Sequence, residues 1–136
     1  FIWEALNNIP LSLDNGGETT RDFIYVEDIA EGLIACALTG IPGGVYNLAS
    51  GKETKIKELA EKIIQYTNSK SILELLPKRD WDNSGRRFGE TDKSEKEIGF
   101  KCKVNFDEGI KKTVEWTITN KDIIQNCINK HNYFKY

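Results

Sequence analysis

Strand-like and helix-like segments alternate along this chain, and the alternation restricts the fold more than any other feature. Four short runs have the apolar, β-branched and aromatic composition of strands, at residues 9–13, 22–26, 44–50 and 71–76. Elsewhere apolar residues recur at helical spacing, as at Ile56, Leu59, Ala60, Ile63 and Ile64. The pattern predicts an α/β fold, or a small α+β unit cut from an α/β protein. With 136 residues, the chain has room for one compact domain.

Capping and helix-breaking residues predict where the helices begin and end. The predicted N-caps are Asp28, Thr54, Asp92 and Asn105, with Glu95 and Glu108 completing capping boxes for the last two. The first of these helices has an apolar face made of Ile29, Ala30, Leu33, Ile34, Ala37 and Leu38. We expect that helix to end at residues 39–44, the second near 67–70 and the third at Gly99. Residues 1–8 have the spacing of the last turns of a further helix.

The charge balance and the apolar pattern exclude several classes of protein. Nineteen Lys and Arg residues stand against 21 Asp and Glu residues, and no basic block forms a footprint for nucleic acid. No apolar run reaches the roughly 18 residues of a membrane helix, and no signal-peptide pattern is visible. We therefore expect a cytoplasmic protein that binds neither nucleic acid nor a membrane. The chain has no methionine and begins with the bulky Phe1, which predicts that it is a piece of a longer translated protein.

Two features match fragments of catalytic motifs but are better explained without catalysis. The single histidine, His131, lies in a Lys- and Asn-rich tail, so a solvated residue is expected rather than a member of a triad. Tyr66 and Lys70 have the Y-x-x-x-K spacing that lets an ammonium group lower the pKa of a phenol. The residues between them end a helix, so we interpret the spacing as coincidence.

A glycine-rich segment and three cysteines also carry no site. Residues 39–44, TGIPGG, follow a helix and precede a strand, whereas a dinucleotide-binding loop leaves a strand and enters a helix. We expect a turn there. Cys36, Cys102 and Cys127 are odd in number and widely spaced, which predicts neither a disulfide framework nor a zinc site.

Four stretches in a fixed order carry a family resemblance. They are FIWEALNNIPLSLDNGGETTRDFIYVEDIAEGLIACAL, GVYNLASGKETKIKELAEKI, RDWDNSGRRFGETDKSEKEIGF and NFDEGIKKTVEW. Together they resemble the C-terminal part of the extended short-chain dehydrogenase/reductase family. This is the group of NAD-dependent nucleotide-sugar epimerases, dehydratases and decarboxylases, including enzymes like UDP-glucose 4-epimerase.

The resemblance implies a division of labour in a longer protein. In this family an N-terminal Rossmann domain binds NAD(P) and carries a catalytic tyrosine and lysine, while the C-terminal portion grips the nucleotide diphosphate of the sugar. Residues 1–118 would then be the nucleotide-sugar-binding portion and residues 119–136 a C-terminal helical tail. NAD would bind to the missing Rossmann half, with no cofactor on this chain. We expect that this chain alone would not catalyse the parent enzyme's hydride transfer.

The same resemblance assigns roles around Arg21. It implies that Arg21 reaches a phosphate of the nucleotide sugar, for which a planar and permanently charged guanidinium is well suited. Two interpretations of Asp22 stay open: it orients Arg21, or it is a turn residue in an ordinary ion pair. By resemblance Asn47 places an amide near the nucleotide, although a capping or turn role fits equally well.

A second candidate region is the irregular segment that contains Arg79, Arg86 and Arg87. Three clustered cations repel one another, and a bound diphosphate would relieve that repulsion. The family pattern R-x-x-D implies that Asp82 accepts a hydrogen bond from a base or a ribose hydroxyl. The alternative is a solvated loop balanced by its own carboxylates. The sequence does not decide whether Arg86 or Arg87 points inward.

Partners and rival functions follow from these assignments. The expected ligand is a nucleotide-diphosphate sugar, and the expected assembly is a homo-oligomer. The resemblance implies that much of the apolar face of the helix after Asp28 would normally pack on the Rossmann part, so we expect an exposed apolar patch or self-association. A non-catalytic assembly or ligand-sensing module derived from the same fold is the main alternative function.

Overall fold

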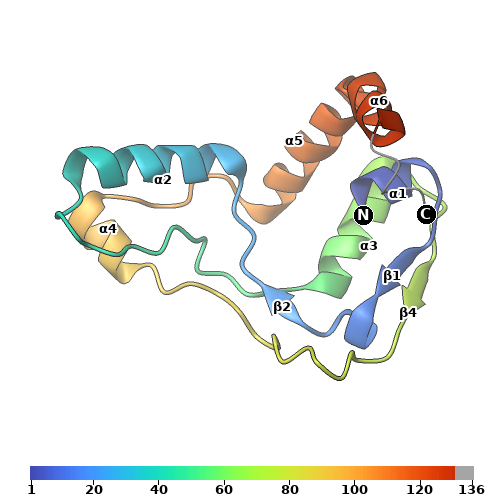
Figure 1. Ribbon diagram of the computed structural model, residues 1–136, viewed down its shortest axis with the longest axis horizontal. Coiled ribbons are helices and arrows are strands. Elements are labelled where there is room, and N and C mark those ends of the chain that lie inside the picture. The colour runs from blue at the N-terminus through green and yellow to red at the C-terminus, as the bar shows by residue number, and fades with distance from the viewer. Residues whose placement is uncertain (131–136) are drawn as a thin grey trace.

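The computed structural model describes residues 1–130, which form a packed end and an extended end joined by long irregular segments (Figure 1). The elements are α1 (Ile2–Leu6), β1 (Leu11–Leu13), the 3-10 turn η1 (Asp14–Gly17), β2 (Thr20–Arg21), α2 (Val26–Thr39), β3 (Thr54–Lys55), α3 (Ile56–Thr67), β4 (Leu73–Leu75), α4 (Asp92–Ile98), α5 (Phe106–Thr119) and α6 (Lys121–Lys130). Helices and short strands alternate, as expected for the α/β class. His131 lies outside the described residues.

The packed end is built around β1, α1, α3 and α5. Its core consists of Ala5, Leu11, Leu13, Ala60, Ile63, Ile110 and Val114. Leu11 and Leu13 point to the same face of β1 because they are two residues apart, and both are almost fully buried. β1 pairs in parallel with β4, with Leu11 opposite Leu73. The predicted strands in residues 9–13 and 71–76 are confirmed, although both are shorter than expected.

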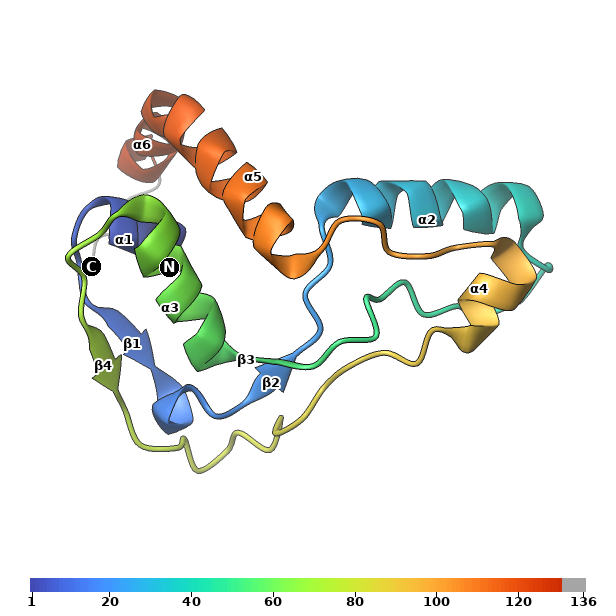
Figure 2. The same cartoon turned by 180° about the vertical axis from the view of Figure 1, so that it is seen from behind.

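The other end contains α2 and α4, which lie side by side and away from the core (Figures 1 and 2). Gly32 brings α2 close to its neighbours, since a Cβ there would lie 2.8 Å from a Leu48 methyl and 2.9 Å from the Phe100 ring. Leu33, Ile34 and Leu38 remain 59%, 59% and 79% exposed. The expected exposed apolar face is therefore present.

Two predicted strands are wrong. Residues 22–26 do not form a strand: the strand lies earlier, at Thr20–Arg21, where it pairs antiparallel with β3, and Val26 already begins α2. Residues 44–50 are irregular, and within residues 1–130 they have no strand partner. Strand-like composition needs a neighbouring strand to become a ladder, and neither segment finds one in the described chain.

Three of the four predicted N-caps are wrong, and one is confirmed. Asp28 is not an N-cap, because α2 begins at Val26 with Tyr25 as its N-cap. Thr54 belongs to β3, and the N-cap of α3 is Lys55. Asp92 lies inside α4, whose N-cap is Thr91. Asn105 is the N-cap of α5 as predicted, and its side chain accepts a hydrogen bond from the Glu108 N–H at 3.0 Å.

The predicted helix ends hold. α2 ends at Thr39. α3 ends at Thr67, where Asn68 adopts a left-handed conformation with φ 49°. Gly99 ends α4 with φ 66°, a conformation that glycine adopts without steric cost. In the described part of the chain, no helix combines the length and the apolar character needed to cross a membrane.

Candidate functional site

Residues 77–90, here called the arginine loop, run beside the small β2–β3 sheet. The Thr20 N–H donates to the Gly85 carbonyl at 3.1 Å. The next residue of β2, Arg21, donates one Nη group to the Ser84 hydroxyl at 2.9 Å. Two predicted regions, Arg21 and the arginine loop, are thus brought together although they are about sixty residues apart.

Arg21 is the half-buried cation of this region. Its other hydrogen bond in the described residues goes to the carbonyl of Thr20, at 2.6 Å. No Asp or Glu side chain of residues 1–130 lies within 4.0 Å of its guanidinium. Arg21 therefore carries a positive charge that neutral hydrogen-bond acceptors hold but do not neutralise.

Asp22 plays neither of the two roles considered for it. Its Oδ1 accepts from the Ser50 N–H at 2.9 Å and from the Ser50 hydroxyl at 2.6 Å. Its Oδ2 accepts from the N–H groups of Gly51, at 2.9 Å, and Gly89, at 3.2 Å. Because both oxygens are engaged, Asp22 ties β2 to the loop at residue 50 and to the end of the arginine loop instead of pairing with Arg21.

Arg86 points toward the sheet and binds Glu53 in a bidentate arrangement. Its Nε donates to Oε1 at 2.8 Å and its Nη2 to Oε2 at 2.7 Å. The Thr20 hydroxyl also donates to Oε1, at 2.5 Å. Hydrogen bonds from Arg86, and then from Thr20, lower the pKa of Glu53 to about 2. Glu53 is therefore ionised at neutral pH and cancels the charge of Arg86.

The other two arginines of the loop differ from Arg86. Arg79 pairs with Asp14 of η1 at 2.5 Å, and its guanidinium lies 5.4 Å from the centre of the Trp81 ring. Arg87 is exposed and makes no hydrogen bond or ion pair with any described residue. The carboxylates that balance Arg79 and Arg86 thus come from outside the loop, unlike those expected from the sequence.

Asp82 and Asn47 both bond within this region. Asp82 accepts from the Ser84 N–H at 2.8 Å. Hydrogen bonding by Ser84, first through its hydroxyl and then through its backbone, lowers the pKa of Asp82, and the charge of Arg21 adds to this effect. Asn47 is exposed and donates its amide to the Glu90 carbonyl at 3.0 Å. Its predicted place at the end of a strand is wrong, because residues 44–50 form none.

Comparison with known proteins gives relatives along most of the chain, although no family model matches it. Mouse dTDP-D-glucose 4,6-dehydratase is 35% identical over 121 residues, which are 85% of this chain and 34% of the mouse protein. The crystal structure of the enzyme WbmF from Bordetella bronchiseptica, in complex with NADH, is 54% identical with a TM-score of 0.86. The epimerase Mth375 from Methanothermobacter thermautotrophicus is 33% identical with a TM-score of 0.88. Over most of its length the chain aligns with members of the extended short-chain dehydrogenase/reductase family of nucleotide-sugar epimerases and dehydratases.

The extent of these matches fits the predicted C-terminal portion of a family member. The alignments cover 97% of this chain but 39% of WbmF, and 92% of this chain but 38% of Mth375. The chain thus spans little more than a third of the length of its relatives. The resemblance and the α/β fold class predicted from the sequence are both confirmed.

The structure shows why two sequence patterns are not the short-chain dehydrogenase/reductase catalytic or cofactor motifs. Tyr66 lies in the last turn of α3, whereas Lys70 lies beyond the left-handed Asn68, so the two do not share a helical face. Tyr66 donates its hydroxyl to Asp107, and this bond raises the pKa of Tyr66, contrary to what a catalytic phenol requires. α2 ends at Thr39, and no helix begins within residues 39–44.

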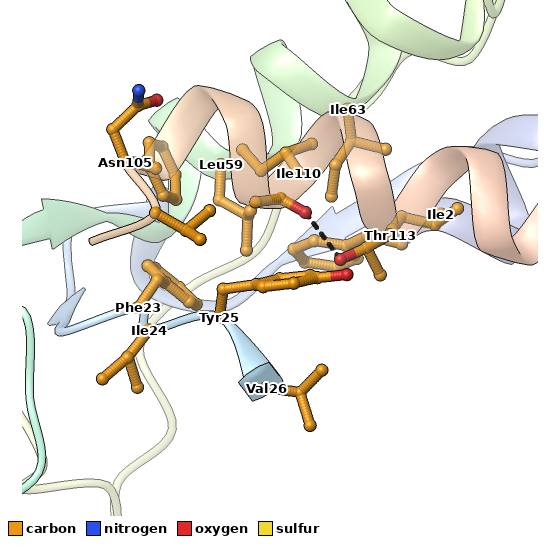
Figure 3. A pocket seen from close by; sticks show the side chains of 14 residues that line it. Ile2, Phe23, Ile24, Tyr25, Val26, Leu59, Ile63, Asn105, Ile110 and Thr113 are labelled. Carbon is orange, nitrogen blue, oxygen red and sulfur yellow. Dashed lines mark hydrogen bonds between the residues drawn. The ribbon is translucent and has the colours of Figure 1, made fainter. Parts of the chain in front are cut away.

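A separate cavity of about 540 Å³ lies between α3, α5 and residues 23–26 (Figure 3). Its walls are largely apolar and include Ile2, Phe23, Tyr25 and Leu59, while the hydroxyl of Thr113, which also lines it, donates a hydrogen bond within α5. None of the predicted site residues lines this cavity. Among residues 1–130, no cluster of His, Cys, Asp or Glu is arranged to hold a metal ion.

Sequence reasoning missed three polar residues of the candidate site: Thr20, Glu53 and Ser84. Their contacts join three segments that are far apart in the sequence. Thr20 begins one short strand and Glu53 precedes another, and neither strand has a composition that gives a local signal. A prediction that β2 pairs with β3 could have found Glu53. In that pairing Arg21 lies opposite Thr54, and Glu53 is the residue directly before Thr54.

Proposed function

We propose that this chain is the substrate-binding part of an NAD-dependent nucleotide-sugar epimerase or dehydratase, and that it holds the nucleotide diphosphate. Arg21 would bind a phosphate oxygen directly. Arg79, Arg86 and Arg87 of the arginine loop would add donors around the diphosphate. Asp82 and Asn47 would bind the nucleoside or line its site. The chemistry is binding and orientation, which lowers a barrier by positioning the sugar.

The observation that carries this proposal is the environment of Arg21. No carboxylate of residues 1–130 forms a direct ion pair with this half-buried guanidinium, although Asp82 is close enough for the charge of Arg21 to lower its pKa, so Arg21 is free to pair directly with an anion from outside. Its neighbours are a carbonyl and a hydroxyl, which fix its orientation without using its charge. A diphosphate supplies the missing charge in a geometry that suits the planar fork of an arginine.

The relatives support the ligand class and the cofactor. One crystal structure of WbmF contains both NAD+ and UDP, and its chain is 52% identical to this one. In the proposed parent protein NAD would bind to residues outside this chain, where it would accept and return a hydride. The residues described here would keep the sugar nucleotide in place during that transfer.

The test is a calorimetric titration of the full-length protein with UDP, GDP and dTDP. We expect one of them to bind, and Arg21→Ala to weaken that binding by about 10- to 100-fold, the range for a lost hydrogen bond to a charged group. Arg21→Lys keeps the charge but loses the fork, so it should recover only part of the affinity.

Lys96→Ala is the matched control, because Lys96 is an exposed cation of α4 outside the candidate site. It should leave the affinity unchanged. Equal losses in Lys96→Ala and Arg21→Ala would show a non-specific charge effect. The absence of binding by any of the three diphosphates would overturn the proposal.

A further inference from the structure

Glu53 joins the β2–β3 sheet to the arginine loop. Its carboxylate accepts one hydrogen bond from Thr20 of β2 and two from Arg86 of the loop, so both oxygens are occupied. The Glu53 side chain is 23% exposed, whereas that of Arg86 is 73% exposed. Glu53 is therefore the inner member of the pair, and Arg86 reaches inward to it.

Polar contacts, and not apolar burial, hold the arginine loop in place. None of residues 77–90 is buried, and the two large aromatic side chains of the loop, Trp81 and Phe88, are 73% and 53% exposed. The second half of the loop is tied to the rest of the molecule through Ser84, Gly85, Arg86, Gly89 and Glu90. Among these ties, only the Arg86–Glu53 pair is bidentate between two charged groups, the strongest class of hydrogen bond in proteins.

The bidentate pair also fixes what Arg86 can offer a ligand. Nε and Nη2 are bonded to Glu53, while Nη1 makes no hydrogen bond with any described residue. The pair has no net charge, so Arg86 supplies a directed donor while Arg21 supplies the positive charge. Ser84, two residues before Arg86, simultaneously supports Arg21. A displacement of Arg86 would therefore disturb both cations.

We propose that Glu53 is a positioning residue for diphosphate binding. By holding Arg86, it keeps the arginine loop against β2, so that Ser84 orients Arg21 and the Nη1 group of Arg86 faces the same ligand. The inference rests on the proposed function, and it adds a residue that does not itself touch the ligand. The opposite possibility is that Glu53 competes with the diphosphate for Arg86, and the two differ in the sign of their effect.

The experiment compares Glu53→Gln with Thr20→Val in the full-length protein. Glu53→Gln removes the charge at almost constant size, whereas Thr20→Val removes the other hydrogen bond to Glu53 and leaves the Arg86 pair intact. With the diphosphate among UDP, GDP and dTDP that the unmodified protein binds, we expect Glu53→Gln to raise Kd about tenfold and Thr20→Val to raise it less.

A second readout separates positioning from general destabilisation. Without ligand, hydrogen exchange at the amides of residues 84–89 should be faster in Glu53→Gln, while exchange in α3 and the urea midpoint stay unchanged. The double variant Glu53→Arg with Arg86→Glu reverses the pair. It should restore the exchange protection that Glu53→Arg alone removes.

Each outcome decides a separate point. Tighter diphosphate binding in Glu53→Gln would overturn the inference, because Glu53 would then be a competitor for Arg86. Unchanged Kd and unchanged exchange would overturn it too. If the unmodified protein binds none of the diphosphates, the proposed function falls. In that case, exchange at residues 84–89 still decides whether Glu53 holds the loop.

Discussion

The two ends of the molecule are stabilised by different kinds of contact. At the packed end, β1, α1, α3 and α5 bury a continuous group of aliphatic side chains. At the other end, the buried residues of α2 are Asp28 and Gly32, and four of its apolar side chains are more than half exposed. The comparison teaches that apolar periodicity in the sequence shows which face a helix will bury. It does not show whether the covering partner lies in the same chain.

At the extended end, carboxylates that accept several hydrogen bonds add to a few buried apolar side chains such as Ile98 and Phe100. Oδ2 of Asp28 accepts hydrogen bonds from the N–H groups of Lys103 and Val104, at 3.2 and 2.9 Å, and from the Cys102 thiol. Asp22 similarly gathers the loop at residue 50 and Gly89. Both carboxylates lie shortly after Arg21, so residues 22–28 hold three separate irregular segments, at residues 50–51, at Gly89 and at residues 102–104.

The largest expected effect comes from the core. Leu11→Ala should lower the free energy of unfolding by about 2–5 kcal/mol, because it leaves a cavity beneath β1 where the leucine is fully buried. Leu33→Ala is the matched control at the extended end, where the leucine is 59% exposed. Its effect should stay within about 0.5 kcal/mol. Urea unfolding measures both, and equal losses would contradict the division into two ends.

A smaller loss is expected when the hydrogen bonds to Asp28 at the extended end are removed. Asp28→Ala leaves the Lys103 and Val104 N–H groups without their acceptor, which should cost about 1–3 kcal/mol in urea unfolding. Asp28→Asn keeps one acceptor oxygen and should cost less. If Asp28→Ala left the free energy of unfolding unchanged, the hydrogen bonds to Asp28 would not stabilise the fold, and other contacts would have to hold the extended end together.

The same residue gives the stability of the extended end a pH dependence. Burial raises the pKa of Asp28, but hydrogen bonds from the Val104 N–H, the Cys102 thiol and the Lys103 N–H lower it below its usual value overall. Its contribution is therefore complete above the unfolded pKa of about 3.9 and is lost as the pH falls through the folded pKa. The stability difference between the unmodified chain and Asp28→Asn should shrink from pH 6 to pH 3.

The sequence predicted the parts of the fold that depend on local signals. The apolar spacing of α3, the Asn105 cap and the left-handed Gly99 are each set by residues within one or two turns. The predictions at residues 22–26 and 44–50 were wrong for the opposite reason. Whether an apolar run becomes a strand depends on a neighbour that no local pattern specifies.

The candidate site was predictable only in outline. The resemblance directed attention to Arg21 and to the arginine loop, and the structure brings these two regions together. The resemblance did not predict that Asp14 pairs with Arg79 or that Glu53 pairs with Arg86, because both carboxylates come from segments distant in the sequence. Side-chain partners across irregular loops follow from the tertiary arrangement, which residue spacing does not encode.

The smallest expected effect on stability comes from a substitution on the exposed apolar face of α2. Leu38 is 79% exposed on α2, so Leu38→Lys should change the free energy of unfolding by less than about 0.5 kcal/mol. It should nevertheless reduce the binding of a hydrophobic dye to this chain and any self-association seen in sedimentation, because it places a charge within the apolar face. Lys57→Leu on α3 is a control that adds an apolar group elsewhere. If Leu38→Lys unfolded the chain, contacts within the chain would already cover this apolar face, and the two ends would not differ in how they are stabilised.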